Sequence, residues 1–265
     1  MSDNSIDLTV TSPPYDNLRN YNNNSDFNFD KFKEIAVELY RVTKKGGVFV
    51  WVVGDQTIKG SETGTSFKQA LYFKEIGFNL HDTMIWEKSG MIPTQDRYYN
   101  VFEYMFILSK GKPKTMNFLK DRKNKAPGKK YRKNKVINKG QPSYKDGDEF
   151  TLGEYGRRTN IWCIYTGKNK FSSNHPAPFP FALARDHILT WSEENDIVFD
   201  PFLGSGTTAF ACIEVNRSFI GTEIEQNYFS DTKQRIEDYL SEAENASDFL
   251  FITENNDERN KTNPK

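Results

Sequence analysis

The residues of this 265-residue chain best suited to chemistry are Thr11-Ser12-Pro13-Pro14-Tyr15. They follow the apolar run at residues 6–10, which predicts a buried strand, and the two prolines end that strand because they lack an N–H and have a fixed φ. The turn presents the Ser12 hydroxyl and prolyl carbonyls beside the flat face of Tyr15. It is either an ordinary Pro-Pro loop with a surface tyrosine or a rigid site for a planar group that carries an NH₂.

A second candidate stretch lies far along the chain, at Asp200-Pro201-Phe202-Leu203-Gly204-Ser205-Gly206-Thr207-Thr208. Residues 196–200 predict a short strand and residues 207–215 a helix, so the stretch is a turn between them. Gly204 and Gly206 allow the backbone to approach a ligand closely and to adopt conformations that other residues avoid. The stretch lacks the Gly-Lys-Ser/Thr ending of a phosphate-binding loop, which disfavours phosphate binding.

Glu223 completes this second site. It stands about twenty residues after the turn, directly past a strand predicted at residues 218–222. A strand, glycine turn, helix, strand and acid in this order place a nucleoside at the carboxyl ends of a parallel sheet. We therefore predict that the Glu223 carboxylate accepts hydrogen bonds from both ribose hydroxyls.

The two motifs together resemble the S-adenosylmethionine-dependent amino-methyltransferases of DNA, and their order is that of the permuted, beta class. The resemblance covers roughly residues 6–240 and implies S-adenosyl-L-methionine as cofactor. It implies catalytic roles for Ser12, Pro13, Pro14 and Tyr15, and cofactor contacts from Thr11, Asp200, Pro201, Phe202, Gly204, Ser205, Gly206, Thr207 and Glu223. Asp200 would contact the methionine amino group or cap a helix, and Phe202 would pack beside the cofactor or in the core.

The implied reaction uses the Ser12 hydroxyl and the Pro13 carbonyl as acceptors for the two N–H bonds of an exocyclic amine, while Tyr15 stacks on the flipped-out base. Methylation of a cytosine ring carbon needs a cysteine, usually after proline, and neither Cys163 nor Cys212 follows a proline. In the family, Ser-Pro-Pro-Tyr is more often associated with N4 of cytosine and Asp-Pro-Pro-Tyr with N6 of adenine. Cytosine is therefore favoured, and adenine stays open.

Alternating strands and helices must position both turns, so we predict an α/β fold with a Rossmann-like methyltransferase sheet and circularly permuted motif order. Residues 48–53 form a continuous apolar run, as in a strand covered on both faces. Further strands are predicted at 78–86 and 101–108, and helices at 32–40, 67–73, 181–189 and 224–240.

The formal net charge is zero, with 36 basic and 36 acidic residues, but thirteen lysines and arginines and one acid lie between Lys110 and Lys139. This segment is either a solvated loop or a basic insertion that recognises double-stranded DNA. The predicted DNA-binding residues are Lys123, Lys125, Lys129, Lys130, Arg132 and Lys133, with Asn124 among those expected to read base edges. The predicted domains are a catalytic half (1–109), a target-recognition insertion (110–170), a cofactor-binding half (171–245) and a polar tail (246–265).

The composition favours a cytoplasmic protein, because no apolar run is long enough to span a bilayer and the two cysteines are far apart. The three scattered histidines predict no metal site. A cognate restriction endonuclease is an expected partner, and the chain is a monomer or a homodimer. Relatives often carry a Gly-Asp segment and a helix before the first motif, whereas this chain starts a few residues before its strand. Methylation of RNA or a protein amide, or a DNA-binding module without catalysis, are the alternatives.

Overall fold

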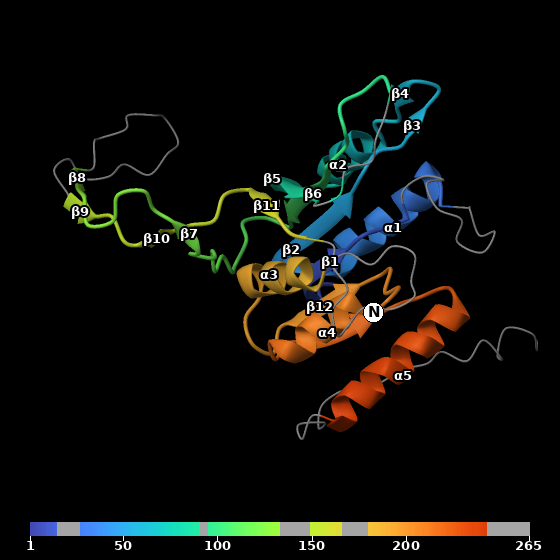
Figure 1. Cartoon of the computed structure of the whole chain (residues 1–265). Helices are drawn as coiled ribbons and strands as arrows, with labels where there is room; N and C mark the ends of the chain where they lie inside the picture. Colours follow the sequence, from blue (N-terminus) through green and yellow to red (C-terminus); the bar gives the residue numbers. More distant parts are fainter. Residues whose placement is uncertain (15–26, 89, 91–94, 133–148, 166–179, 243–265) are drawn as a thin grey trace, which may run out of the picture.

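The computed structural model describes residues 1–14, 27–88, 90, 95–132, 149–165 and 180–242. In these residues one sheet has seven strands in the order β11-β5-β6-β2-β1-β12-β13 (Figure 1). Its strands are β1 (Ile6–Thr11), β2 (Thr43–Val53), β5 (Asn79–Glu87), β6 (Phe102–Ser109), β11 (Ile161–Cys163), β12 (Ile197–Asp200) and β13 (Ser218–Gly221). The helices are α1 (Phe29–Val42), α2 (Thr65–Glu75), α3 (Phe181–Trp191), α4 (Thr207–Glu214) and α5 (Gln226–Glu242).

Helices cover both faces of this sheet, which confirms the predicted α/β fold. Along β2, Val48, Val50 and Val52 enter the core beneath α3 and α4, whereas Phe49 and Trp51 enter the core beneath α1 and α2. Successive side chains of a strand point to opposite faces, so a strand that is buried on both sides has a continuous apolar sequence. The sheet is mixed, because β6 runs antiparallel to both β2 and β5 while the other pairings are parallel.

The pairing of β1 with β12 determines where the two motifs lie. The two strands are parallel neighbours, with Leu8 opposite Val198 and Thr9 opposite Phe199. Their carboxyl ends therefore emerge at the same edge of the sheet, although they are 189 residues apart in sequence. Ligand sites in open α/β sheets lie at this edge.

Asp7 anchors the opposite end of β1. Its side chain is buried, and it accepts hydrogen bonds from Lys44 Nζ and Lys114 Nζ, both at 2.6 Å, and from the amide of Ile197 at 3.0 Å. Burial alone would raise the pKa of the Asp7 carboxyl, but the hydrogen bonds from Lys114, Lys44 and the Ile197 amide lower it below its ordinary value. One buried carboxylate thus connects β1, β2, β12 and the start of the basic segment.

The basic segment extends from the sheet as a two-stranded arm (Figure 1), which we define as residues 119–132 and 149–158. Within it β7 (Arg122–Lys123) pairs antiparallel with β10 (Tyr155–Gly156), and β8 (Lys130–Arg132) pairs with β9 (Glu149–Thr151). The rings of Tyr131 and Phe150 stack across the second ladder, with centroids 5.6 Å apart. Among the described residues, none in these two ladders belongs to a hydrophobic core, so cross-strand pairs must hold their register.

The sequence places residues 161–163 in an insertion outside the sheet, but the structure places them within it. They form β11, the edge strand, parallel to β5 with Trp162 opposite Trp86. Trp162 is buried in the core with Leu183 of α3. The chain therefore rejoins the sheet directly after the arm, before residue 170.

β2 begins at Thr43, directly after α1 and before the apolar run predicted at 48–53, and Gly46 within it has a φ of +82°, so the first part of this strand is irregular. A small hairpin of β3 (Thr57–Ile58) and β4 (Ser61–Glu62) follows β2. The polar tail at 246–265 lies outside the described residues. Among the described helices, none combines the length and apolar character that crossing a bilayer requires.

Candidate active site

Asp200 joins the two predicted motifs. Thr11 Oγ1, at the end of β1, donates to Asp200 Oδ1 at 2.5 Å, and Thr208 Oγ1, in the first turn of α4, donates to Asp200 Oδ2 at 2.7 Å. The amide of Phe202 donates to Oδ1 at 3.0 Å. Asp200 is not the N-cap of α4, because Gly206 occupies that position. The carboxylate therefore fixes the Ser12 turn against the glycine turn.

Burial raises the pKa of Asp200 to about 6, and the negative charge of Glu223 adds to this effect. The hydrogen bonds from Thr11 and Thr208 act in the opposite direction, because they stabilise the ionised carboxylate. Above pH 6 the carboxylate is ionised and accepts hydrogen bonds only, so both threonine hydroxyls must act as donors. Their orientation at the edge of the site is thereby fixed.

This raised pKa predicts a pH-dependent contribution to stability. The folded state holds the Asp200 proton at pH values where the unfolded chain has released it, so this contribution falls as pH rises from about 4 through 6. Asp200→Asn removes the titration. We expect the free energy of unfolding of the wild type, minus that of the variant, to fall by about 2 kcal/mol between pH 4 and pH 7. Urea titrations at several pH values measure this difference, and a constant difference would contradict the assignment.

The glycine turn is held from beneath by α5. Gly206 has a φ of +75°, and a Cβ built on it would lie 2.5 Å from Thr232 Cγ2. The hydroxyl of Thr232 donates to the carbonyl of Gly204 at 2.7 Å, and Arg235 Nη1 donates to the carbonyl of Ser205 at 3.0 Å. Sequence reasoning missed Thr232 and Arg235, because nothing in the local pattern of an amphipathic helix marks two of its polar residues as contacts of a distant turn.

Glu223 lies two residues after the end of β13, beside the glycine turn. Its Oε2 accepts the amide of Gly204 at 2.8 Å, and its Oε1 accepts the amide of Glu225 at 2.9 Å. Each carboxylate oxygen offers two acceptor positions, so one position on each remains for a further donor. The half-buried carboxylate thus suits a vicinal pair of hydroxyls, and its two remaining acceptor positions fit the ribose hydroxyls of S-adenosylmethionine.

The hydroxyls of Ser205 and Thr207 are buried and lie 3.0 Å apart, and the carbonyl of Pro201 accepts Thr222 Oγ1 at 2.9 Å. These contacts give the turn its shape. Phe202 packs edge-on against Phe27 and Trp51, with ring centroids 5.6 and 6.2 Å away.

Phe202 is half-buried, so its predicted core role and its predicted cofactor contact are compatible. Ser12 and Pro14 are half-buried and Pro13 is buried. Tyr15 lies outside the described residues. The described part of the predicted catalytic turn therefore lies at the end of β1, next to the junction at Asp200.

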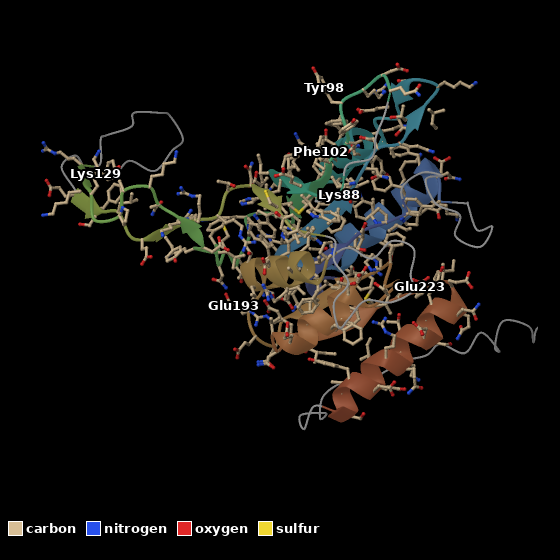
Figure 2. The ribbon with its side chains drawn as sticks, viewed as in Figure 1. Lys88, Tyr98, Phe102, Lys129, Glu193 and Glu223 are labelled. Carbon is tan, nitrogen blue, oxygen red and sulfur yellow. The ribbon has the colours of Figure 1, made fainter. Side chains whose placement is uncertain are left out.

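The predicted DNA-binding residues Lys123, Lys125, Lys129, Lys130 and Arg132 are all exposed on the arm, and Lys133 lies outside the described residues. Figure 2 shows Lys129 far along the arm and Glu223 on the opposite side of the molecule. The prediction for Asn124 is wrong. Its side chain is buried and donates to the carbonyl of Gly153 at 2.9 Å, so it supports the arm rather than facing a ligand.

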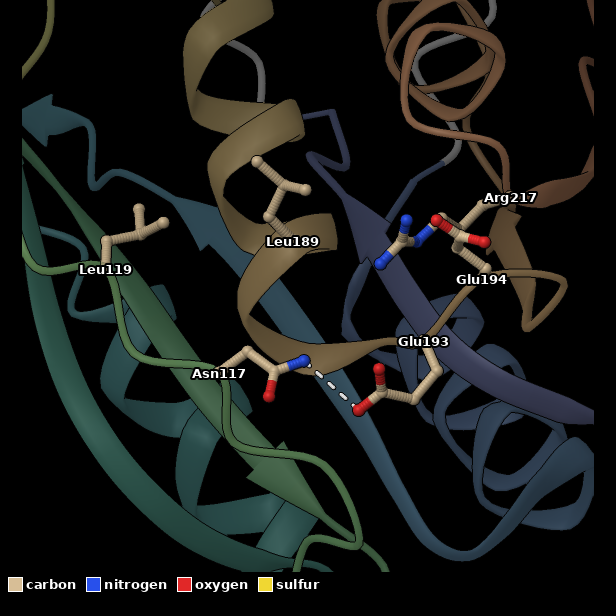
Figure 3. A pocket seen from close by; sticks show the side chains of 6 residues that line it. All are labelled: Asn117, Leu119, Leu189, Glu193, Glu194 and Arg217. Atoms are coloured by element: carbon tan, nitrogen blue, oxygen red, sulfur yellow. Dashed lines mark hydrogen bonds between the residues drawn. The ribbon is translucent and has the colours of Figure 1, made fainter.

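A cavity of about 650 Å³ lies elsewhere, at the amino ends of β12 and β13 (Figure 3). Its lining includes Glu193, Glu194 and Arg217, and Asn117 Nδ2 donates to Glu193 Oε1 at 3.1 Å. The Arg217 guanidinium is held by the hydroxyl and carbonyl of Ser192. This cavity lies at the end of the sheet opposite the two motifs.

The model of the N6/N4 methyltransferase family, described as DNA methylase, matches residues 6–234. The chain therefore belongs to the family of S-adenosylmethionine-dependent DNA amino-methyltransferases, as its two motifs predicted, and its substrate is DNA. S-adenosylmethionine is the cofactor of these methyltransferases.

Two relatives illustrate the similarity within this family. The chain is 57% identical over 247 residues to the orphan methyltransferase M.BamHII of Bacillus amyloliquefaciens, an alignment that covers 91% of this chain and 92% of that protein. It is 30% identical over 246 residues to the type II methyltransferase M.HpaI of Haemophilus parainfluenzae, covering 89% and 70%.

Solved structures share the fold. The cytosine-N4-specific PvuII DNA methyltransferase has a TM-score of 0.63 at 22% identity, covering 88% of this chain and 80% of that one. The Thermus thermophilus protein TTHA0409, in complex with S-adenosyl-L-methionine, has a TM-score of 0.58 at 23% identity, covering 90% of this chain and 88% of that one.

Proposed function

We propose that this protein transfers the methyl group of S-adenosylmethionine to N4 of cytosine in a specific sequence of duplex DNA. The observation that carries the proposal is the 2.5 Å hydrogen bond from Thr11 to Asp200, because it places the Ser12 turn and the glycine turn at one edge of the sheet. A methyl donor bound at the glycine turn then faces the amine of a base held at the Ser12 turn. Proximity and orientation of this kind account for much of the rate of a direct transfer.

Each turn has a separate task in this proposal. Glu223 and the backbone at Gly204 bind the nucleoside part of S-adenosylmethionine, which supplies an electrophilic methyl group on its sulfonium when bound. The Ser12 hydroxyl and the Pro13 carbonyl accept hydrogen bonds from the two N–H bonds of the amine. This draws the nitrogen lone pair out of conjugation with the base and directs it at the methyl carbon. Tyr15 stacks on the flipped base.

The choice of cytosine rests on Ser12, since serine at this position of the motif is more often associated with N4 of cytosine. The PvuII enzyme, named as cytosine-N4-specific, shares the fold of this chain. N6 of adenine is the second candidate, because the same pair of acceptors suits any planar amine.

The arm supplies the proposed duplex-binding surface. The described part of its predicted contact set consists of four lysines and Arg132, and all five side chains are exposed. Cations on a projecting ladder neutralise phosphates without making the whole surface basic, which agrees with the zero net charge of the chain.

Mass spectrometry of nucleosides tests the proposal. DNA from cells that express the chain should contain N4-methylcytosine, and DNA from cells that express the Ser12→Ala variant to the same level should contain much less of it. N6-methyladenine in place of N4-methylcytosine would establish the second candidate. A tritiated-cofactor assay with DNA, RNA and protein fractions checks the substrate class, and label in RNA or protein alone would overturn the proposal.

A further inference from the structure

The arm is connected to the body of the protein at a narrow root. There the chain that leaves the sheet and the chain that returns to it meet through the amide of Arg158, which donates to the carbonyl of Leu119 at 2.9 Å. Beyond this point the described strands of the arm pair with one another and not with the seven-stranded sheet. The contacts at the root therefore determine the direction in which the arm points.

The guanidinium of Arg158 binds carboxylates from two different parts of the molecule. Its Nε donates to Asp121 Oδ2 at 3.0 Å, on the outgoing strand of the arm, and its Nη1 donates to Asp186 Oδ2 at 2.7 Å, on α3. Asp186 is only 4% exposed, and the Arg158 side chain that reaches it is 25% exposed. One side chain thus joins both strands of the arm to a helix that packs on the sheet.

The flat face of the same guanidinium rests on the core. Its Cζ lies 4.8 Å from the ring centroid of Trp162 in β11, and Trp162 stacks on His187 of α3 with centroids 4.4 Å apart and 24° between the rings. Burial, and then the nearby charge of Arg158, lower the pKa of His187 to about 3, so this ring is neutral at working pH. A cation over stacked neutral rings is attracted to them.

We propose that Arg158 is a positioning residue that sets the angle of the arm relative to the active-site edge, so that a duplex bound along the arm presents its base to the Ser12 turn. The inference rests on the proposed function, because it assigns the arm to duplex DNA. Only arginine can bind both carboxylates and stack on the Trp162 ring at the same time. Its planar fork engages two carboxylates while its face stacks on a ring, whereas the ammonium of lysine is a single point charge.

The test compares steady-state methylation by Arg158→Lys and Arg158→Ala with that of the wild type. We expect the KM for cognate duplex to rise about tenfold or more in both variants, because an arm that can pivot must be ordered each time it binds duplex, which costs binding free energy. The kcat at saturating duplex and the KM for S-adenosylmethionine should stay within about twofold of the wild type. Both variants should fold, because Asp186 keeps its ion pair with Arg185 at 2.9 Å.

Arg185→Ala is the matched control. Arg185 pairs with the same Asp186 but lies next to it on α3, so its removal leaves the arm attached. Its KM for duplex should equal that of the wild type. An equal rise in the KM for duplex in Arg185→Ala and in the Arg158 variants would mean that duplex binding depends on the positive charge near Asp186. The connection of the arm to α3 through Arg158 would then have no role.

Two further readouts separate positioning from direct phosphate contact. If Arg158 contacted a phosphate directly, Arg158→Lys would keep most of the affinity for duplex. Arg158→Ala would lower the magnitude of the salt slope of binding by about 0.9. If Arg158 positions the arm, lysine should not restore the KM for duplex, and the salt slope of binding should stay unchanged. The backbone amide of residue 158 should exchange its hydrogen faster in the variants than in the wild type. Rescue by lysine, or a wild-type KM in Arg158→Ala, would overturn the inference. Absence of duplex binding by the wild type would instead overturn the proposed function.

Discussion

Replacing Ser12 by alanine should lower kcat about 10²-fold while the Kd for S-adenosylmethionine changes less than about twofold. The serine hydroxyl is one of two proposed acceptors for the amine, and an acceptor that is needed mainly in the transition state contributes to kcat rather than to binding. The residue is half-buried at the carboxyl end of β1, whereas the proposed nucleoside contacts come from Gly204 and Glu223 across the edge. Single-turnover kinetics and calorimetric titration of the cofactor measure the two quantities.

Ser5→Ala is the control for this variant. Ser5 precedes the other end of the same strand, and its hydroxyl donates to the carbonyl of Ser2 at 2.7 Å in an exposed turn. It should leave kcat unchanged. A Ser12→Ala protein with wild-type kcat would remove the hydroxyl from the mechanism. A variant that lost cofactor binding in parallel would show instead that Ser12 shapes the cofactor pocket.

The motifs were predictable from sequence because each is encoded locally. Two prolines end a strand wherever they occur, and a glycine turn between a strand and a helix has the same backbone requirement in any sheet. The observed parallel pairing of β1 with β12 then follows from the known logic of parallel sheets, in which carboxyl ends share one edge. The catalytic and cofactor-binding residues that the sequence indicated, Glu223 apart, all lie within these two motifs.

The remaining features depend on contacts between distant segments. Thr232 resembles any polar residue of a helix, and only its contacts with Gly204 and Gly206 identify it as a support of the turn. β11 is three residues long and pairs with a strand more than seventy residues earlier, so neither length nor periodicity marks it. Asn124 was predicted to read bases from its type alone, and its buried bond to the Gly153 carbonyl was not visible in composition.

Replacing Glu223 by alanine should weaken the binding of S-adenosylmethionine about 100-fold. Two hydrogen bonds from ribose hydroxyls to a charged acceptor contribute about 3 kcal/mol together, which corresponds to that factor. The variant also leaves the Gly204 amide without its 2.8 Å partner, which adds to the loss through the glycine turn. At saturating cofactor, kcat should fall only a few fold, because the Ser12 turn is held independently through Asp200.

Glu223→Gln separates the two contributions. Its amide oxygen can still accept the Gly204 amide, but its nitrogen has no acceptor position for a hydroxyl, so the Kd should lie between those of the wild type and Glu223→Ala. Glu225→Ala is the control, because only the backbone amide of Glu225 contacts Glu223, and its Kd should match the wild type. If Glu223→Gln binds the cofactor as tightly as the wild type, the carboxylate serves the turn alone, and the ribose hydroxyls must find their acceptors elsewhere along this edge.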